Sequence, residues 1–219
     1  TTQYHLIKKN YHKEVYRMLL SHALGLFTHP DEEWETIRKE HTSPFKMAFY
    51  ICILAAIAPV CAYISTTQYG WQIGNGQLVF LSESSAIALS TLTYIAIVAG
   101  IYFIGIMIDW MSRNYGSGHD EYAANGIALT AYSCTPLFLV GLTALYPEPW
   151  VVVVSYLAAA SYAAYLMYDG LPHVLKISED QAFFFVGSIL TVALIYLVST
   201  LIGSVIIWSV GIGPEFVTR

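Results

Sequence analysis

The sequence AANGIALTAYSCTPLFLVGLTAL, residues 123–145, decides the fold. It carries no charged side chain and is long enough to cross the hydrocarbon core of a bilayer at about 1.5 Å per residue. Its middle is polar, because four hydroxyl side chains stand just before Pro136, namely Thr130, Tyr132, Ser133 and Thr135. A proline removes a backbone donor, and in lipid the freed carbonyls need hydroxyls, water or neighbouring helices as partners. We therefore expect this segment to be the central helix of a membrane-embedded bundle.

The composition also indicates a membrane protein. Hydrophobic residues make up 56% of the chain and charged residues only 11%, whereas soluble domains average about 25% charged residues. The net charge of −5 gives no support for a nucleic-acid partner. The three cysteines, Cys52, Cys61 and Cys134, lie in apolar runs without metal-site spacing, so we interpret them as free packing residues.

Five uncharged stretches predict five membrane spans, and hence an all-α, polytopic membrane helix bundle. The predicted spans cover about 45–64 with Pro59 inside, 84–108, 122–146, 150–168 and a run that starts near Ala182. We expect the last run to break near Gly211 to Pro214, and the polar stretch 169–181 to be a connection that ends in a Ser178–Gln181 capping box. An Asn75-Gly76 pair between the first two spans is typical of a tight hairpin turn.

Residues 1–43 form a separate segment before the five-span domain of residues 44–219. Apolar residues at helical spacing alternate there with cations, which predicts an amphipathic helical region. Two interpretations fit: the region lies on the lipid surface, or it packs on the ends of the bundle. A short helix is predicted to begin near Pro30, with Trp34 and Ile37 on a face that docks on the membrane interface.

The distribution of cations predicts the orientation. Seven of the ten Lys and Arg residues precede or open the first span: Lys8, Lys9, Lys13, Arg17, Arg38, Lys39 and Lys46. Cytoplasmic loops carry the excess of positive charge, so the N-terminal region is predicted to be cytosolic and the C-terminus to lie outside.

Three short motifs carry a resemblance to a known family. Residues 27–37 read F-x-x-P-x-x-x-W-x-x-I, with Pro30, Trp34 and Ile37; residues 131–136 read AYSCTP, with Tyr132, Thr135 and Pro136; and residues 168–172 read Y-x-G-x-P, with Tyr168, Gly170 and Pro172. In this order they resemble the bacterial branch of the Yip1 family, although Ala131 stands where glycine is usual. The resemblance implies a five-span protein of the bacterial inner membrane. Eukaryotic members bind Rab GTPases and support vesicle traffic, but their Asp-Leu-Tyr-Gly-Pro hallmark is missing here, so the resemblance implies a fold rather than an activity.

Histidine and carboxylate side chains gather in the predicted cytoplasmic loops. The candidate metal ligands among them are His29, Asp31, His119 and Asp120. Imidazole and carboxylate groups suit Zn²⁺, Mn²⁺ or Fe²⁺, so a divalent metal is one interpretation. The other is that these residues cap helices and face solvent.

The polar belt of the third span also has two interpretations. Its members are Asn125, Thr130, Tyr132, Ser133 and Thr135. They could line a pore or bind a small polar solute, or they could tie helices together through hydrogen bonds. At the end of the second span, Asp109 needs a partner, and Arg113 lies one turn on.

No nucleophile, phosphate-loop or metalloprotease motif is present, so the sequence favours a non-enzymatic protein. We predict a scaffold or membrane-organising component with the lipid bilayer and an unidentified protein as partners. Small residues on the spans, such as Gly203 and Ser204, are also compatible with a homo-oligomer. The alternative is a small channel or transporter for a polar solute or a divalent metal ion.

Overall fold

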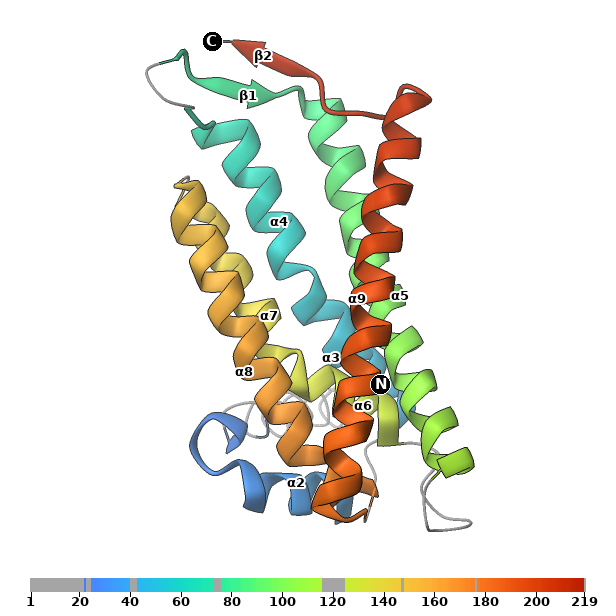
Figure 1. The fold of residues 1–219 in the computed structure, drawn as a ribbon. Coiled ribbons are helices and arrows are strands. Elements are labelled where there is room, and N and C mark those ends of the chain that lie inside the picture. The colour runs from blue at the N-terminus through green and yellow to red at the C-terminus, as the bar shows by residue number, and fades with distance from the viewer. Residues whose placement is uncertain are drawn as a thin grey trace, which may run out of the picture.

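The computed structural model describes His22 and residues 25–39, 43–72, 76–115, 125–146, 148–175 and 177–218. Within these residues, five helical segments are long and apolar enough to cross a membrane. They are Pro44–Tyr69, Glu83–Asn114, Gly126–Leu145, Pro149–Leu175 and Asp180–Ser209. The predicted five-span helix bundle is therefore confirmed (Figure 1).

A short helix, α2, precedes the spans and lies across one end of the bundle (Figure 1). The described elements are α2 (Pro30–Lys39), α3 (Pro44–Ala55), α4 (Ile57–Ile64), the π-helical turn η1 (Ser65–Tyr69), β1 (Val79–Leu81), α5 (Glu83–Tyr115), α6 (Asn125–Ser133), α7 (Thr135–Val140), the 3₁₀ turn η2 (Gly141–Leu145), α8 (Pro149–Leu175), α9 (Glu179–Ser209) and β2 (Phe216–Thr218). As predicted, α2 begins at Pro30, whose missing N–H costs nothing in a first turn.

Two prolines break the first and third spans. The first span interrupts its helix at Ala56, three residues before Pro59, and the third at Cys134, two residues before Pro136. Each proline lacks the N–H that would bond to the carbonyl four residues earlier, and its ring crowds that carbonyl. The kinks let α4 and η2 pack together at one end of the bundle and α6 pack on α5 at the other.

The fourth span is longer than predicted. We expected a polar connection from residue 169, but α8 continues through Gly170 and Pro172 to Leu175. The reason is packing: Leu171, Val174 and Leu175 are buried, and only the last turn must accommodate the proline. The capping box that starts α9 is confirmed, since the Ser178 hydroxyl and the Gln181 backbone and side chain bond reciprocally.

The end opposite α2 carries a small sheet that the sequence did not predict. Strand β1 pairs antiparallel with β2, so the chain after α9 is tied to the connection between the first two spans. As expected, α9 ends before the glycines, and Gly211 adopts a positive φ of 95°. A Trp71–Val79 bridge encloses the predicted hairpin turn, whose Asn75 lies outside the described residues.

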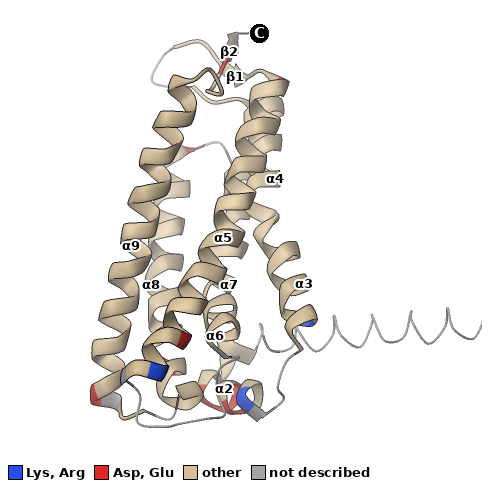
Figure 2. Ribbon diagram, turned by 90° about the vertical axis from the view of Figure 1, so that its right-hand side faces the viewer, with Lys and Arg blue, Asp and Glu red and all other residues tan. Residues whose placement is uncertain are grey.

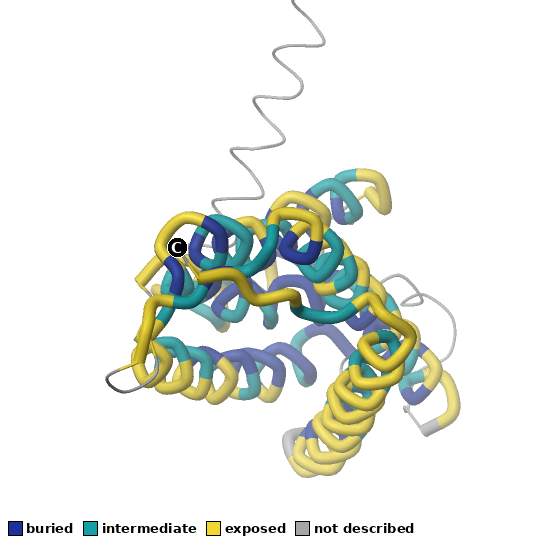
Figure 3. The backbone as a smooth tube through the Cα atoms, turned by 90° about the horizontal axis from the view of Figure 1, so that it is seen from above, coloured by how far each residue is buried: buried dark blue, intermediate teal, exposed yellow. Residues whose placement is uncertain are grey.

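The cations lie at one end of the bundle, and the five spans differ in how deeply they are buried. The described cations belong to α2, the start of α3 and the end of α5, and blue appears only at that end in Figure 2. Burial is greatest in the third span and least in α9, which is exposed along most of its length (Figure 3). The core thus sits where α2 meets α6 and α8.

Candidate functional site

Trp34 fastens α2 to the bundle. The indole is 0% exposed and Ile37 is 5% exposed, so this face packs on protein and not on the membrane interface as we expected. Trp34 lies directly on Gly170 of α8: a Cβ atom there would come within 2.6 Å of the indole Cε2 and 2.7 Å of Leu129 Cδ1. Only glycine allows this approach, which explains why two of the motifs contain Trp34 and Gly170.

Further contacts extend this junction along α8. Arg38 Nη1 donates a hydrogen bond to the His173 carbonyl at 3.2 Å. The Tyr162 hydroxyl donates to the Leu26 carbonyl at 3.2 Å, and Phe27 stacks on the Tyr162 ring at 5.4 Å between centroids. The segment before α2 is therefore packed on the bundle where the structure describes it.

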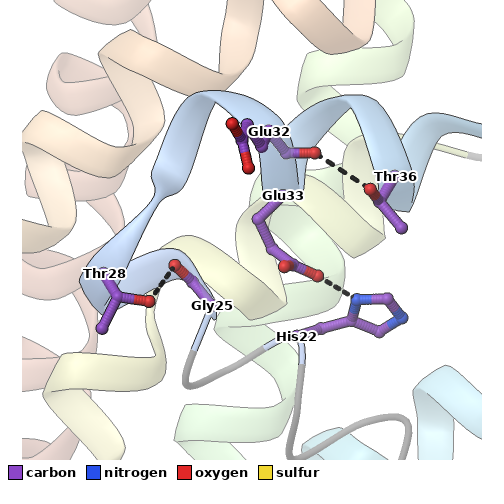
Figure 4. Close-up of polar contacts among 6 residues, drawn as sticks. All are labelled: His22, Gly25, Thr28, Glu32, Glu33 and Thr36. Carbon is purple, nitrogen blue, oxygen red and sulfur yellow. Dashed lines mark hydrogen bonds and ion pairs between the residues drawn. The ribbon is translucent and has the colours of Figure 1, made fainter.

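His22 connects that segment to the third span. It is 4% exposed, and its Nδ1 pairs with the Glu33 carboxylate (Figure 4). Its ring meets Tyr132 edge-on, with centroids 6.0 Å apart, and Tyr132 packs on Tyr50 at 5.0 Å. The half-buried contact between His22 and Glu33 of α2 thus reaches the centre of the polar belt through the His22 ring.

The polar belt itself is closed. Thr130, Tyr132 and Ser133 are 0% exposed and Thr135 is 1% exposed. The Thr130 hydroxyl donates to the Gly126 carbonyl at 2.8 Å, and Thr135 Oγ1 bonds to Tyr50 OH at 2.6 Å. The Thr135–Tyr50 bond joins α7 to α3, as the helix-tying interpretation expects, whereas the Thr130 bond stays within α6. The Asn125 side chain lies outside the described part of the chain.

Asp109 has a different partner from the one predicted. Its Oδ1 accepts the backbone N–H of Gly126 at 2.9 Å and so caps the start of α6. Arg113 instead donates from Nε to the Asp109 backbone carbonyl at 3.2 Å. The approach is close because Gly126 lies against Gly105, where a Cβ would meet the neighbouring backbone.

An acidic pocket opens beside the Trp34 contact. It has a volume of about 490 Å³ and is lined by Asp31, Tyr168, Asp169, Pro172 and His173. The carboxyl groups of Asp31 and Asp169 face each other within interaction distance. His173 Nδ1 lies 2.8 Å from the Asp169 carbonyl, which only accepts, so Nδ1 donates this hydrogen bond and Nε2 takes no part in it.

Only two of the four predicted metal ligands, His29 and Asp31, lie in the part of the chain that the structure describes. Asp31 lines the acidic pocket and His29 is exposed, while His119 and Asp120 lie outside the described residues. Within the described residues, no three His, Cys, Asp or Glu side chains are grouped so that they could hold a metal ion.

The comparisons with known proteins agree with this architecture. The Yip1 domain profile matches residues 24–202. The chain belongs to the Yip1 domain family. Its Yip1 relatives include the inner membrane protein YohC of Escherichia coli strain K12 and its counterpart in strain CFT073. Each is 37% identical over 193 residues, which cover 88% of this chain and 98% of the relative. No solved structure matches the chain.

The Yip1 motifs therefore meet at one junction. All three motifs contribute buried residues where α2, α6, α7 and α8 pack: Trp34 and Ile37 from the first, Tyr132 and Thr135 from the second and Gly170 from the third. Sequence reasoning missed Asp169 and Tyr50. Asp169 stands between Tyr168 and Gly170 of the third motif and one turn before His173, a signal that was available. Tyr50 had no such signal, because its bond to Thr135 joins residues 85 positions apart.

Proposed function

We propose that this chain is a non-enzymatic component of the bacterial inner membrane that acts by binding other proteins at its α2 end. The observation that carries the proposal is the closed polar belt. Its described side chains, Thr130, Tyr132, Ser133 and Thr135, are 0–1% exposed, which supports a role for the outer surfaces in function. The relatives named inner membrane proteins support the location.

The orientation belongs to the same proposal. Arg38 is in α2, Lys46 in the first turn of α3 and Arg113 in the last turn of α5, which places these cations at one end of the bundle. The positive-inside rule assigns that end to the cytoplasm. Cysteine labelling of intact cells at Thr28 and Thr218 tests it: we expect only position 218 to react with an impermeant reagent, and the reverse would overturn the orientation.

The exposed side of α2 is the proposed binding surface. Trp34 and Ile37 hold the helix in place, so Glu32 and Thr36 on the opposite side face outward. Glu32 accepts from Thr36 only through its backbone carbonyl, at 2.9 Å, which leaves its carboxylate available (Figure 4). A rigid helix on a fixed base loses little conformational freedom when a partner binds.

Quantitative cross-linking in membranes tests the proposal. The variants are Glu32→Arg with Thr36→Arg on α2, and a control, Glu148→Arg, which also replaces an exposed glutamate by arginine but at the other end of the bundle. We expect the same specific neighbours with the native protein and the control, and their loss with the α2 variant. Neighbours that are identical in all three proteins would reject the α2 surface.

Flux measurements test the transport alternative. Proteoliposomes that contain the native chain are expected to pass Mn²⁺ and small polar solutes no faster than empty liposomes. Flux that is abolished by Tyr132→Phe or Thr135→Val would contradict the scaffold proposal and restore the pore interpretation.

A further inference from the structure

The acidic pocket between α2 and α8 contains an unbalanced pair of carboxyl groups. Asp31 and Asp169 face each other, and within the described residues neither forms an ion pair with a lysine or arginine. The nearby guanidinium of Arg38 is turned to the His173 carbonyl. Two carboxylates at short range repel, so the pair needs a proton, a cation or a wider separation.

Two buried polar atoms, one in the pair and one beside it, are available to a bound water or ion. Trp34 Nε1 and Asp169 Oδ2 have no hydrogen-bond partner among the described residues. The indole is 0% exposed and its N–H faces the Asp169 carboxyl, but is not aligned to donate to it. A buried donor and a buried acceptor without partners are both unfavourable, and one water at this position would serve both.

The pocket has the size and access for a hydrated ion. Its volume is about 490 Å³, whereas one water occupies about 30 Å³ in the liquid. Asp31 is exposed and Asp169 is half-buried, so an ion can enter from solvent.

The ligand set selects the kind of cation. We infer that Asp31 and Asp169 bind one hydrated divalent cation of the Mg²⁺ or Mn²⁺ type, which fastens α2 to the end of α8. Ions that keep several waters need only one or two carboxylates from the protein. A dehydrated Zn²⁺ site needs three or four protein ligands, and no such group exists among the described residues. His173 Nε2, on the rim, is available to a coordinated water.

This site revises the metal prediction made from the sequence. It keeps Asp31, leaves out His29, and adds Asp169 from a span that was expected to end before it. The site does not depend on a protein partner, because both carboxyl groups belong to the chain itself. A failed cross-linking experiment at Glu32 and Thr36 therefore leaves it untouched.

Mn²⁺ titration of the full chain tests the inference. The protein is purified in detergent, stripped with a chelator and titrated with Mn²⁺ while free Mn²⁺ is followed by electron paramagnetic resonance. The variants are Asp31→Asn and Asp169→Asn, which keep the shape of each side chain, and the control is Glu32→Gln on the same helix. We expect one site in the native protein and the control. In each Asn variant it should weaken by about tenfold or more, since even an outer-sphere partner is worth about 10–100-fold in metal affinity.

Thermal unfolding separates ion binding from a purely structural role. Native protein should gain thermal stability with Mn²⁺, whereas the Asn variants should be more stable than native protein in chelator and gain nothing from the ion. Binding that is equal in all four proteins would place the ion elsewhere and overturn the inference. Native protein that binds no Mn²⁺ would overturn it as well, and stabilisation of that protein by mild acid alone would assign the pair to a shared proton.

Discussion

The third span and α9 are both long and apolar, and α9 carries charge only in its first turn, at Glu179 and Asp180, yet the two occupy opposite environments. Of the 18 residues in the most apolar window of each, 56% are buried in the third span and 6% in α9. The third span is broken at Cys134 and packs on α5, α8 and the first span. In contrast, α9 is one continuous helix whose described neighbours are mainly α5 and α8.

The difference shows what marks the interior of a membrane bundle. Hydropathy does not distinguish a buried helix from a lipid-facing one, because lipid is as apolar as a packed leucine side chain. The buried span instead has glycines that admit a neighbouring helix and hydroxyls that bond across helices, as Thr135 does to Tyr50. The serine and threonine hydroxyls of α9 donate to carbonyls of their own helix, for example Thr191 to Gly187, whereas the Tyr196 hydroxyl reaches the Ala96 carbonyl of α5. We therefore expect substitutions at the junction around the third span to be costly and those in α9 to be tolerated.

The largest effect is expected at Trp34. Truncation in Trp34→Ala removes a fully buried indole from between Gly170 and Leu129, so it should lower the free energy of unfolding by about 3–5 kcal/mol. Trp208→Ala is the matched control, because Trp208 is 44% exposed on α9. Unfolding in detergent, followed by tryptophan fluorescence and circular dichroism, measures both. Equal losses in the two variants would contradict the difference between the regions.

Glycine-to-alanine substitutions test the same difference between the junction and α9, with a smaller expected change in stability. In Gly170→Ala, the new methyl group would clash with Trp34 and Leu129, and overpacking of this kind costs about 1–3 kcal/mol. In Gly203→Ala on α9, the methyl group meets nothing within 4 Å, so stability should stay the same or rise by a few tenths of a kcal/mol, as helix propensity favours alanine. A tolerated alanine at position 170 would mean that α2 is not held against α8 as described.

The Tyr50–Thr135 hydrogen bond gives the third prediction. Thr135→Val leaves the buried Tyr50 hydroxyl without this partner and should cost about 1–2 kcal/mol. Removal of both groups in Tyr50→Phe with Thr135→Val should cost less than the sum of the single changes, because no orphaned hydroxyl remains. Thr200→Val on α9 is the control, since the Thr200 hydroxyl bonds only to the Leu197 carbonyl on its own exposed surface. Additive single effects would show that the belt is not tied across helices.

The sequence predicted the spans well and the junction poorly, for a physical reason. Span number and the α9 capping box depend on residues close in sequence, such as Ser178 and Gln181. The junction depends on pairs far apart, such as Trp34 with Gly170 and Asp31 with Asp169, which no local pattern specifies. The end of α8 was mispredicted because Gly170 and Pro172 usually stop a helix, and only the packing of α2 explains why this one continues.

The smallest change in stability is expected at the helix caps. The caps of α6 and α9 are both hydrogen bonds from a backbone N–H to a side-chain oxygen, but the first is buried and the second is exposed. Asp109 caps α6 and is 8% exposed, whereas Ser178 caps α9 in an exposed capping box. Loss of an N-cap side chain costs about 0.5–2 kcal/mol, so Asp109→Ala should lie near the upper value and Ser178→Ala near the lower. Ser178→Ala should loosen only the first turn of α9, seen as faster amide exchange there with little change in global unfolding. In Asp109→Ala, the buried Gly126 N–H loses its acceptor inside the packed contact between α5 and α6, so global stability should fall with it. A global loss for Ser178→Ala as large as that for Asp109→Ala would mean that α9 is as tightly coupled to the bundle as the third span is.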